Sequence, residues 1–290
     1  MSRHITVEGV QACYGSVVAL DDISLSIERG RPLALLGRNG AGKTTLLSTL
    51  AGLVVPTRGH VHVPRGVSVS YLPEERGVYP SMTVTEHLRY FSRISGAGEA
   101  AARRWCEAFD LVRYSDFRVR ELSKGNQQRV QLACALIDDP DCVLLDEPFS
   151  GLDPIGKTLV SEVLADYARD HWVVLSAHDV RAIAEMVTDI AFVRDGRIVC
   201  TGSVEDLCAS YGGHRLTVER PEAVEDAVAG RPGLSCSRTE LGWLQVHGLK
   251  DYTSAVALLA QGSDPGSFTW AAPSLSELYV LVLGHQEDPL

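Results

Sequence analysis

A phosphate-binding loop is predicted where a short apolar run, Ala34 to Leu36, is followed by a glycine-rich segment and a helical pattern. Glycines let backbone N–H groups approach phosphate oxygens, and the helix that follows points its positive N-terminus at them. In such a loop Lys43 reaches the β and γ phosphates and the hydroxyl of Thr44 can bind Mg²⁺. The predicted nucleotide-binding residues here are Gly37, Arg38, Asn39, Gly40, Ala41, Gly42, Lys43, Thr44 and Thr45.

Two adjacent carboxylates end a second apolar run, Cys142 to Leu145. Side chains alternate across a strand, so Asp146 and Glu147 cannot do the same work. We expect Asp146 to meet the Mg²⁺ shell and Glu147 to face the γ-phosphate as the general base for an attacking water. A positioned base of this kind contributes about 10²–10⁴-fold to a rate.

These segments, with others in the same order, resemble the nucleotide-binding subunit of ATP-binding-cassette (ABC) transporters over at least residues 1 to 210. Leu122-Ser123-x-Gly125 matches the family signature, and Ser150 to Asp153 match its D-loop. His178 matches the switch histidine, and Tyr14 matches the aromatic residue that stacks on adenine. The resemblance implies an α/β fold, in which a P-loop ABC-ATPase core carries a helical subdomain.

The resemblance also implies a shared site, because one chain has one phosphate loop and one signature. Ser123 is placed to cap a helix, whose start would form a second phosphate-binding terminus. In the family this terminus faces the ATP of the partner, so we expect a homodimer that closes head to tail on two ATP molecules. The signature residues expected to act on the partner's ATP are Ser123, Lys124, Gly125 and Asn126; Asp153 belongs to the D-loop.

Three positions depart from the usual family pattern. Glu74 stands where the family usually has Gln, and Lys124 and Asn126 replace Gly and Gln in the signature. An ionised carboxylate can bind Mg²⁺, but it accepts hydrogen bonds only, so Glu74 is expected as a metal ligand and not as a donor to water. These variants resemble the branch that serves drug, sodium and other exporters with separately encoded membrane subunits.

Composition indicates a globular chain. It has 290 residues, of which 45% are hydrophobic and 22% charged, with a net charge of −10 and seven cysteines without a C-x-x-C pair. The acidic balance argues against a nucleic-acid partner. Neither a membrane-spanning apolar stretch nor a signal peptide is evident, so we expect a cytoplasmic protein, peripheral on the inner face of the membrane, that works with a separate transmembrane permease.

Two domains are predicted, with a joint at Gly212-Gly213. Residues 1–212 form the ATPase domain, with a helical subdomain at about 76–139 that begins at a Thr83/Glu86 capping box. Residues 213–290 are expected as a small α+β, ferredoxin-like domain in β-α-β-β-α-β order. In the family a groove beside the helical subdomain receives the permease, and Val78 and Tyr79 are our candidates for that contact.

Three functions remain open on the sequence. The first is the ATP-hydrolysing subunit of an ABC exporter. The second is a soluble ABC ATPase of translation or DNA repair, although such proteins usually join two cassettes or carry a long insertion. The third is a regulatory or scaffold protein that binds ATP without hydrolysing it. This hypothesis is suggested by Glu74 and Lys124, which depart from the family pattern.

Overall fold

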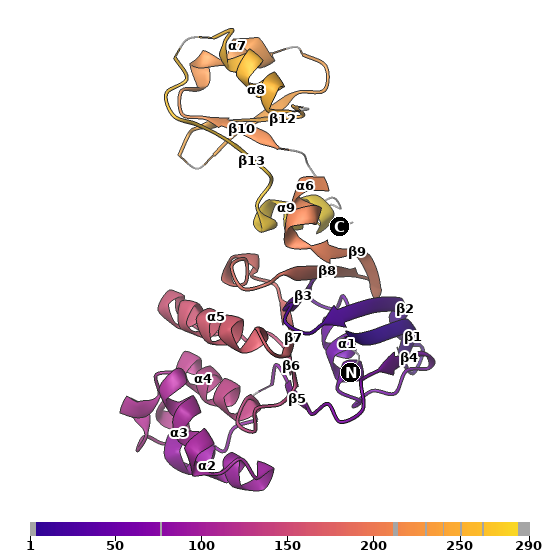
Figure 1. Cartoon of the computed structure of the whole chain (residues 1–290), viewed down its shortest axis with the longest axis vertical. Helices are drawn as coiled ribbons and strands as arrows, with labels where there is room; N and C mark the ends of the chain where they lie inside the picture. The colour runs from indigo at the N-terminus through magenta and orange to yellow at the C-terminus, as the bar shows by residue number, and fades with distance from the viewer. Residues whose placement is uncertain are drawn as a thin grey trace. The chain divides into compact units, whose positions relative to one another are not determined.

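The computed structural model of the chain describes residues 4–75, 77–210, 214–229, 231–239, 241–249, 251–262 and 264–283. It divides into two compact units, Met1–Gly202 and Ser203–Leu290, which are treated one at a time (Figure 1). Helix α6 (Val204–Ser210) lies in the second unit and packs against helix α9 (Leu275–Leu283). Gly212-Gly213 falls outside the described residues, so the boundary between 212 and 213 stays a prediction.

The first unit contains two sheets. The antiparallel sheet has the strand order β2-β1-β4, and the larger sheet has the order β5-β6-β7-β3-β8-β9, in which the first five strands pair in parallel. Strands β3, β6 and β7 are buried along their whole length, as expected for a parallel sheet covered on both faces. The bounds are β1 His4–Tyr14, β2 Val17–Glu28, β3 Leu33–Leu36, β4 Arg58–His62, β5 Val69–Leu72, β6 Cys142–Leu145, β7 Trp172–Ala177, β8 Asp189–Arg194 and β9 Arg197–Ser203.

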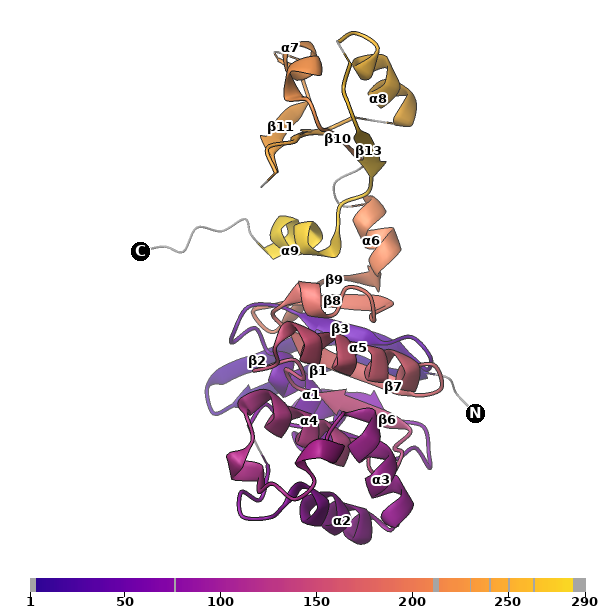
Figure 2. The same cartoon turned by 90° about the vertical axis from the view of Figure 1, so that its left-hand side faces the viewer.

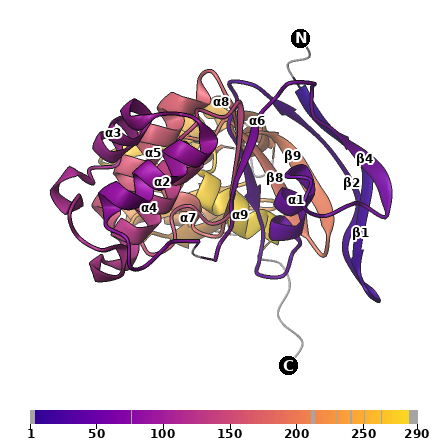
Figure 3. The ribbon, with the colours of Figure 1, turned by 90° about the horizontal axis from the view of Figure 1, so that it is seen from below.

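The core of this unit lies around helix α1 (Lys43–Leu50), which follows the phosphate loop. Leu46, Leu47 and Leu50 of this helix pack with buried side chains of β1, β2, β3, β6 and β7 in one cluster. Helix α5 (Pro154–Ala168) packs against β7, and Figure 3 shows the antiparallel sheet and helices α2 to α5 on opposite sides of the central strands. The phosphate loop therefore starts from the middle of a rigid, two-layered core.

The helical part consists of α2 (Val84–Ser95), α3 (Glu99–Ala108) and α4 (Lys124–Ala135), which pack on one another (Figure 2). The predicted capping box is confirmed: the N–H of Glu86 donates to Thr83 Oγ1 at 3.2 Å, and the N–H of Thr83 donates to Glu86 Oε2 at 2.8 Å. These two bonds satisfy N–H groups that the first turn of α2 would otherwise leave unpaired.

The second unit confirms the predicted β-α-β-β-α-β order. Its antiparallel sheet has the order β11-β12-β10-β13, with α7 and α8 on one side and α6 and α9 on the other (Figures 1 and 2). This is the strand order of a ferredoxin-like domain. An ion pair between Arg215 and Glu277 ties β10 to α9. The bounds are β10 Arg215–Val218, α7 Glu225–Val228, β11 Ser235–Arg238, β12 Leu244–His247, α8 Tyr252–Leu259 and β13 Phe268–Ala271.

The seven cysteines all lie in the described part of the chain, and none forms a disulfide. Cys142 and Cys208 are buried, four others are half-buried, and only Cys236 in β11 is exposed. Burial raises the pKa of the Cys142 thiol to about 12. None of the described helices combines the length and the hydropathy that crossing a bilayer would require.

Candidate active site

The phosphate loop runs from the end of β3 to the start of α1 and is shaped by its glycines. A Cβ atom on Gly37 would lie 2.3 Å from the carbonyl oxygen of Val193, so no larger residue fits there without a shift of the backbone. Gly42, the N-cap of α1, has a φ of 107°, a conformation that residues with a side chain rarely adopt. The loop therefore presents its backbone close to the N-terminus of α1, which favours an anion.

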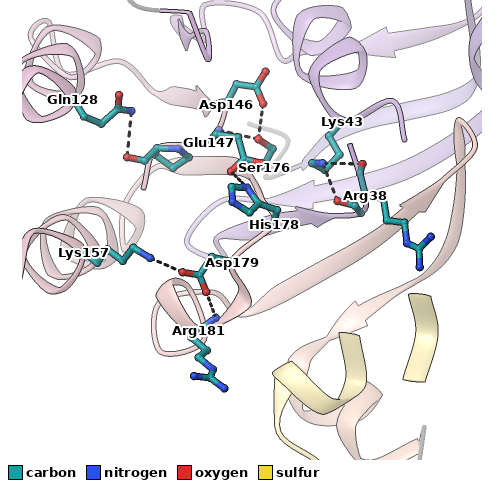
Figure 4. A network of polar contacts seen from close by, with 12 residues as sticks. Arg38, Lys43, Gln128, Asp146, Glu147, Lys157, Ser176, His178, Asp179 and Arg181 are labelled. Atoms are coloured by element: carbon teal, nitrogen blue, oxygen red, sulfur yellow. Dashed lines mark hydrogen bonds and ion pairs between the residues drawn. The ribbon is translucent and has the colours of Figure 1, made fainter. Parts of the chain in front are cut away.

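Lys43 is the buried one of the two cationic residues in this loop, the other being Arg38. Its side chain is nearly buried, with 7% exposure, and its Nζ donates to the carbonyl oxygens of Gly37 at 2.9 Å and Arg38 at 3.2 Å (Figure 4). The ammonium group is thus held over the loop by neutral acceptors, which leaves its charge available to a phosphate.

Asp146 follows β6 and is 1% exposed. Its Oδ1 accepts a hydrogen bond from Ser176 Oγ at 2.5 Å, whereas its Oδ2 is buried without a hydrogen-bond partner among the described residues. A buried carboxylate oxygen without a partner is costly, so this atom is suited to a cation or to a water bound to one.

Glu147 has a backbone φ of 50°, which is uncommon for a residue other than glycine. Its N–H donates to Ser176 Oγ at 2.9 Å, and its Oε2 lies 2.7 Å from His178 Nδ1 (Figure 4). The Glu147 side chain is 12% exposed and that of His178 is 61% exposed. The Glu147 carboxylate is therefore held by the imidazole of His178, which follows β7 and is itself open to solvent.

A cleft of about 630 Å³ collects most of the predicted nucleotide-binding residues. Glu74, Asp146, Glu147 and His178 line it together with one face of the loop, so the structure brings the predicted base, metal ligands and phosphate loop to one place. The loop residues in its lining are Asn39, Gly40, Ala41, Gly42, Lys43, Thr44 and Thr45.

The residues around this cleft fit Mg²⁺. The unpaired Oδ2 of Asp146, the exposed hydroxyl of Thr44 and the carboxylate of Glu74 are all oxygen donors, which Mg²⁺ prefers. No group of three or more His, Cys, Asp or Glu side chains with metal-binding geometry occurs in the described ranges. Mg²⁺ is usually held by one or two carboxylates together with water and substrate phosphates, and Asp146 and Glu74 are carboxylates in the lining of the cleft.

Several predicted residues lie outside the lining of this cleft. Gly37 and Arg38 contribute the carbonyls that bind Lys43, and Tyr14, 54% exposed, stands at the end of β1. The described lining includes none of the four signature residues; Ser123 instead caps α4 and accepts the N–H of Asn126 at 3.3 Å. Asp153 caps α5 and accepts the N–H of Gly156 at 2.8 Å. Within one chain, therefore, the signature does not reach the cleft that holds the phosphate loop.

Two contacts connect the cleft to the neighbouring helices. Gln128 Nε2 of α4 donates to the carbonyl of Pro148 at 3.2 Å, next to the predicted base (Figure 4). Lys157 Nζ of α5 lies 2.5 Å from Asp179 Oδ2, directly after His178, and this hydrogen bond lowers the pKa of the Asp179 carboxyl. The strand ends that carry Glu147 and His178 are thus tied to α4 and α5.

The sequence did not identify three residues of the site. Ser176 is the first, although its hydroxyl donates to Asp146 Oδ1 and accepts the N–H of Glu147. Val17 and Val18, with 63% and 50% exposure, line the cleft beside Gly42. The signal in the sequence that could have identified these two residues is a pair of consecutive valines shortly after the aromatic Tyr14, in the segment that precedes the loop.

Comparisons with known proteins agree with this arrangement. Residues 20–150 match the family model described as "ABC transporter". The chain is 30% identical to the uncharacterized ABC transporter ATP-binding protein YhaQ of Bacillus subtilis, over 97% of this chain and 98% of that one. It is 33% identical to the Nod factor export ATP-binding protein I of Ralstonia nicotianae, over 70% and 68%. A solved dimeric structure of a bacterial ABC transporter cassette, MJ0796, superposes on 69% of this chain and 98% of its own with a TM-score of 0.61 and 23% identity, which shows a common fold.

Proposed function

Because the chain belongs to the family of ABC transporter ATP-binding subunits, we propose that two copies close head to tail on two ATP molecules and so drive a separate membrane permease. The observation that carries the proposal is that the two halves of the ATP site, the phosphate loop and the signature, lie at different places in one chain. Among the described residues, the phosphate loop and Glu147 line the cleft of one chain, and the residues that start the signature helix do not. A second chain is the natural source of the missing half.

Within the cleft we assign the following work. The phosphate loop and Lys43 bind the β and γ phosphates. Val17 and Val18 in the cleft lining, with Tyr14 paired to Val17 outside it, provide an apolar surface for the adenine ring. Glu147 orients and deprotonates the attacking water, and the contact with His178 keeps its carboxylate aimed. Asp146, Thr44 and Glu74 hold Mg²⁺. When bound, Mg²⁺ would supply positive charge next to the phosphates, which offsets negative charge during transfer of the γ-phosphoryl group to water.

The partner's contribution follows from the geometry of α4. Its first turn begins at Ser123, whose hydroxyl accepts the N–H of Asn126, and it forms the positive end of the helix. In a head-to-tail dimer this terminus meets the γ-phosphate of the opposite chain, with Lys124, Gly125 and Asn126 beside it. Asp153, as the cap of α5, fixes the loop that would cross the dimer interface.

The membrane partner is proposed to bind beside the helical part. A cavity of about 480 Å³ lies between β5 and helices α2 and α4, and the exposed side chain of Ile94 is in its lining. Tyr79 packs next to it on Tyr90 and Phe91 and is 44% exposed. A cavity of mixed polar and apolar lining beside the exposed aromatic side chains of Tyr79 and Tyr90 is suited to an amphipathic helix of a permease at the inner face of the membrane. Export is the proposed direction, in line with the Nod factor export relative.

The experiment that tests this proposal is ATP hydrolysis by the purified chain as a function of its concentration. The rate per chain should rise with concentration, because a complete site needs two chains. Glu147→Gln should bind ATP, remain dimeric with it in size-exclusion chromatography, and hydrolyse it at least about 100-fold more slowly.

A rate per chain that is independent of concentration, with a monomer at all concentrations, would contradict the shared site. Hydrolysis by Glu147→Gln at the parent rate would show that another group is the base. ATP-dependent dimers that turn over only when a detergent-solubilised membrane partner is added would support the transporter assignment and show that the permease completes the active state.

A further inference from the structure

Ser176 is a polar residue at a place where the fold does not require one. It lies in β7 among Trp, Val, Leu and Ala residues, and its exposure is 0%. A buried hydroxyl is costly unless it is hydrogen-bonded. Ser176 Oγ makes two such bonds, and both go to the end of the neighbouring strand β6: it donates to Asp146 Oδ1 at 2.5 Å and accepts the N–H of Glu147 at 2.9 Å.

The register of the sheet produces this juxtaposition. Strands β6 and β7 pair in parallel with Leu145 opposite Leu175, so the next residue of each chain segment, Asp146 and Ser176, also come side by side. His178, two residues further along, falls on the same side and reaches the Glu147 carboxylate. One strand end therefore holds both the backbone and the side chain of Glu147.

The bond to Asp146 decides which carboxylate oxygen is free. A serine hydroxyl has a single proton to donate, and here it is given to Oδ1. Oδ2 remains buried and unpartnered within the described residues. With the carboxylate fixed through Oδ1, the free oxygen can point in one direction only, which pre-organises it for a cation and its water shell.

The bond to Glu147 supports an unusual backbone. The φ of 50° at Glu147 is disfavoured for a residue with a side chain and persists where the surroundings hold it. The Ser176 hydroxyl satisfies the N–H of this turn, which lies at the buried end of the strand. Without that acceptor the N–H would be unpaired and the turn free to relax, and the carboxylate above it would move.

We propose that Ser176 is a positioning residue that couples metal binding to the general base through one hydroxyl. Its hydroxyl orients the Asp146 carboxylate so that Oδ2 is free for Mg²⁺, and it also stabilises the backbone conformation of Glu147. The inference rests on the proposed roles of Asp146 and Glu147, and it adds a fully buried residue that is not among the described residues lining the nucleotide cleft. The Ser176 hydroxyl should therefore affect metal affinity and turnover together, and leave metal-free nucleotide binding unchanged.

The test compares Ser176→Thr with Ser176→Val in the full chain. The two variants add nearly the same bulk to the strand and differ in the hydroxyl, so steric effects on packing are matched; Ser176→Ala removes the hydroxyl without added bulk. Three quantities are measured: ATP affinity in EDTA by calorimetry, Mn²⁺ affinity of the ATP complex from the signal of free Mn²⁺ in electron paramagnetic resonance, and the Mg²⁺ concentration for half-maximal hydrolysis.

We expect Ser176→Val and Ser176→Ala to bind ATP in EDTA within about twofold of the parent and to bind Mn²⁺ about 5–10-fold more weakly, the effect of losing one hydrogen bond of ordinary strength. Ser176→Thr should restore most of the Mn²⁺ affinity. Equal Mn²⁺ affinity in the Thr and Val variants would overturn the proposal, as would an equal loss of metal-free ATP binding. If Ser176→Val does not fold, as judged by its thermal unfolding, the same comparison between Ser176→Ala and the parent decides.

The proposed function can fail separately from this inference. A parent chain that binds no Mn²⁺ with ATP would reject the metal site itself. A parent that binds Mn²⁺ and hydrolyses ATP, with variants indistinguishable from it, would reject only the role of Ser176.

Discussion

At the residue scale, Lys43 is a cation whose surroundings favour binding of an anion. Its ammonium group is almost buried, and its described acceptors are two backbone carbonyls. Replacing Lys43 by Ala removes the charge that meets the β and γ phosphates. Charge-assisted hydrogen bonds contribute about 1.5–3 kcal/mol, so the dissociation constant for ATP should rise roughly 10–100-fold. Calorimetric titration with ATP measures this directly.

Lys157→Ala is the matched control for that measurement. Lys157 is also a partly sheltered lysine, but its partner is Asp179 and it does not line the phosphate cleft among the described residues. ATP affinity should stay near that of the parent. An equal loss in both variants would mean that the effect of Lys43 is one of folding and not of phosphate binding.

Glu74 shows how one substitution in a family pattern changes the electrostatics of a site. The structure places it in the lining of the cleft with Asp146 and Glu147, so three carboxylates face the same nucleotide. Like charges that share one cleft disfavour one another unless a cation lies between them. We therefore expect Glu74 to favour binding of the nucleotide together with Mg²⁺ over binding of free ATP.

At the scale of elements, His87 connects helix α2 to its neighbours. It is 1% exposed; its Nε2 accepts the N–H of Tyr79 at 3.1 Å, and its Nδ1 lies 3.3 Å from Cys134 Sγ of α4. The bond from Tyr79 requires Nε2 without a proton, so the neutral ring is the one that fits. Burial lowers the pKa of His87 to about 4.

The stability of the protein should therefore depend on pH through His87. In the unfolded chain its pKa is near 6.5, so between about pH 6.5 and 4 the unfolded state binds more protons than the folded one. The contribution is fully present above pH 6.5 and is lost as the pH falls toward 4, with a slope of up to about 1.4 kcal/mol per pH unit. Urea unfolding at a series of pH values from 7 to 5 measures it.

His87→Gln provides the comparison, since an amide oxygen can accept the Tyr79 N–H and does not titrate. Its free energy of unfolding should fall less steeply with decreasing pH than that of the parent, because the carboxylates titrate alike in both. Parallel slopes would show that the His87 ring does not stay neutral in the folded state.

The elements that carry the chemistry could be predicted from the sequence because each depends on local signals. The phosphate loop has its glycines, Thr83 and Glu86 form a box within one turn, and the Leu144-Leu145-Asp146-Glu147 pattern marks a buried strand that ends in carboxylates. The link from Ser176 to Asp146 could not be predicted, because it depends on the parallel register of β6 and β7. That register is a tertiary property, set between segments thirty residues apart in the chain.

The same reason applies to Val17 and Val18. Their place in the cleft depends on how the β1–β2 hairpin packs against the loop at Gly42, where a Cβ atom would lie 2.8 Å from the carbonyl of Ala19. A close approach of two backbones leaves no periodic pattern in the sequence. The roles given to Tyr14, the signature residues and Asp153 stay predictions, since they act only when nucleotide and a second chain are present.

At the scale of the whole molecule, a shared site predicts that two inactive chains can restore activity to each other. Lys43→Ala removes the cation that meets the phosphates in its own chain, and Ser123→Arg blocks the signature helix start. In a mixed dimer, the Ser123→Arg chain supplies an intact phosphate loop and the Lys43→Ala chain an intact signature, so one complete site forms. An equal mixture should reach about a quarter of the parent rate if pairing is random and a single site can turn over.

The control for mixing is a chain that carries both substitutions, combined with either single variant. When the double variant pairs with Lys43→Ala, neither chain has an intact phosphate loop. When it pairs with Ser123→Arg, neither chain has an intact signature. Neither mixture should therefore hydrolyse ATP. Absence of activity in the mixture of single variants, with dimers present by chromatography, would argue that the signature acts within its own chain.

The uneven exposure of the cysteines has a practical consequence. Cys236 is exposed on β11 of the second unit, whereas the other six are at least half sheltered, and burial raises the thiol pKa of Cys106, Cys134, Cys142 and Cys208. A maleimide nitroxide or fluorophore should thus attach first at this natural position. Two copies labelled there would report, by their mutual distance in frozen or single-molecule samples, whether the accessory domains approach each other as the nucleotide cycle proceeds, without any engineered attachment point.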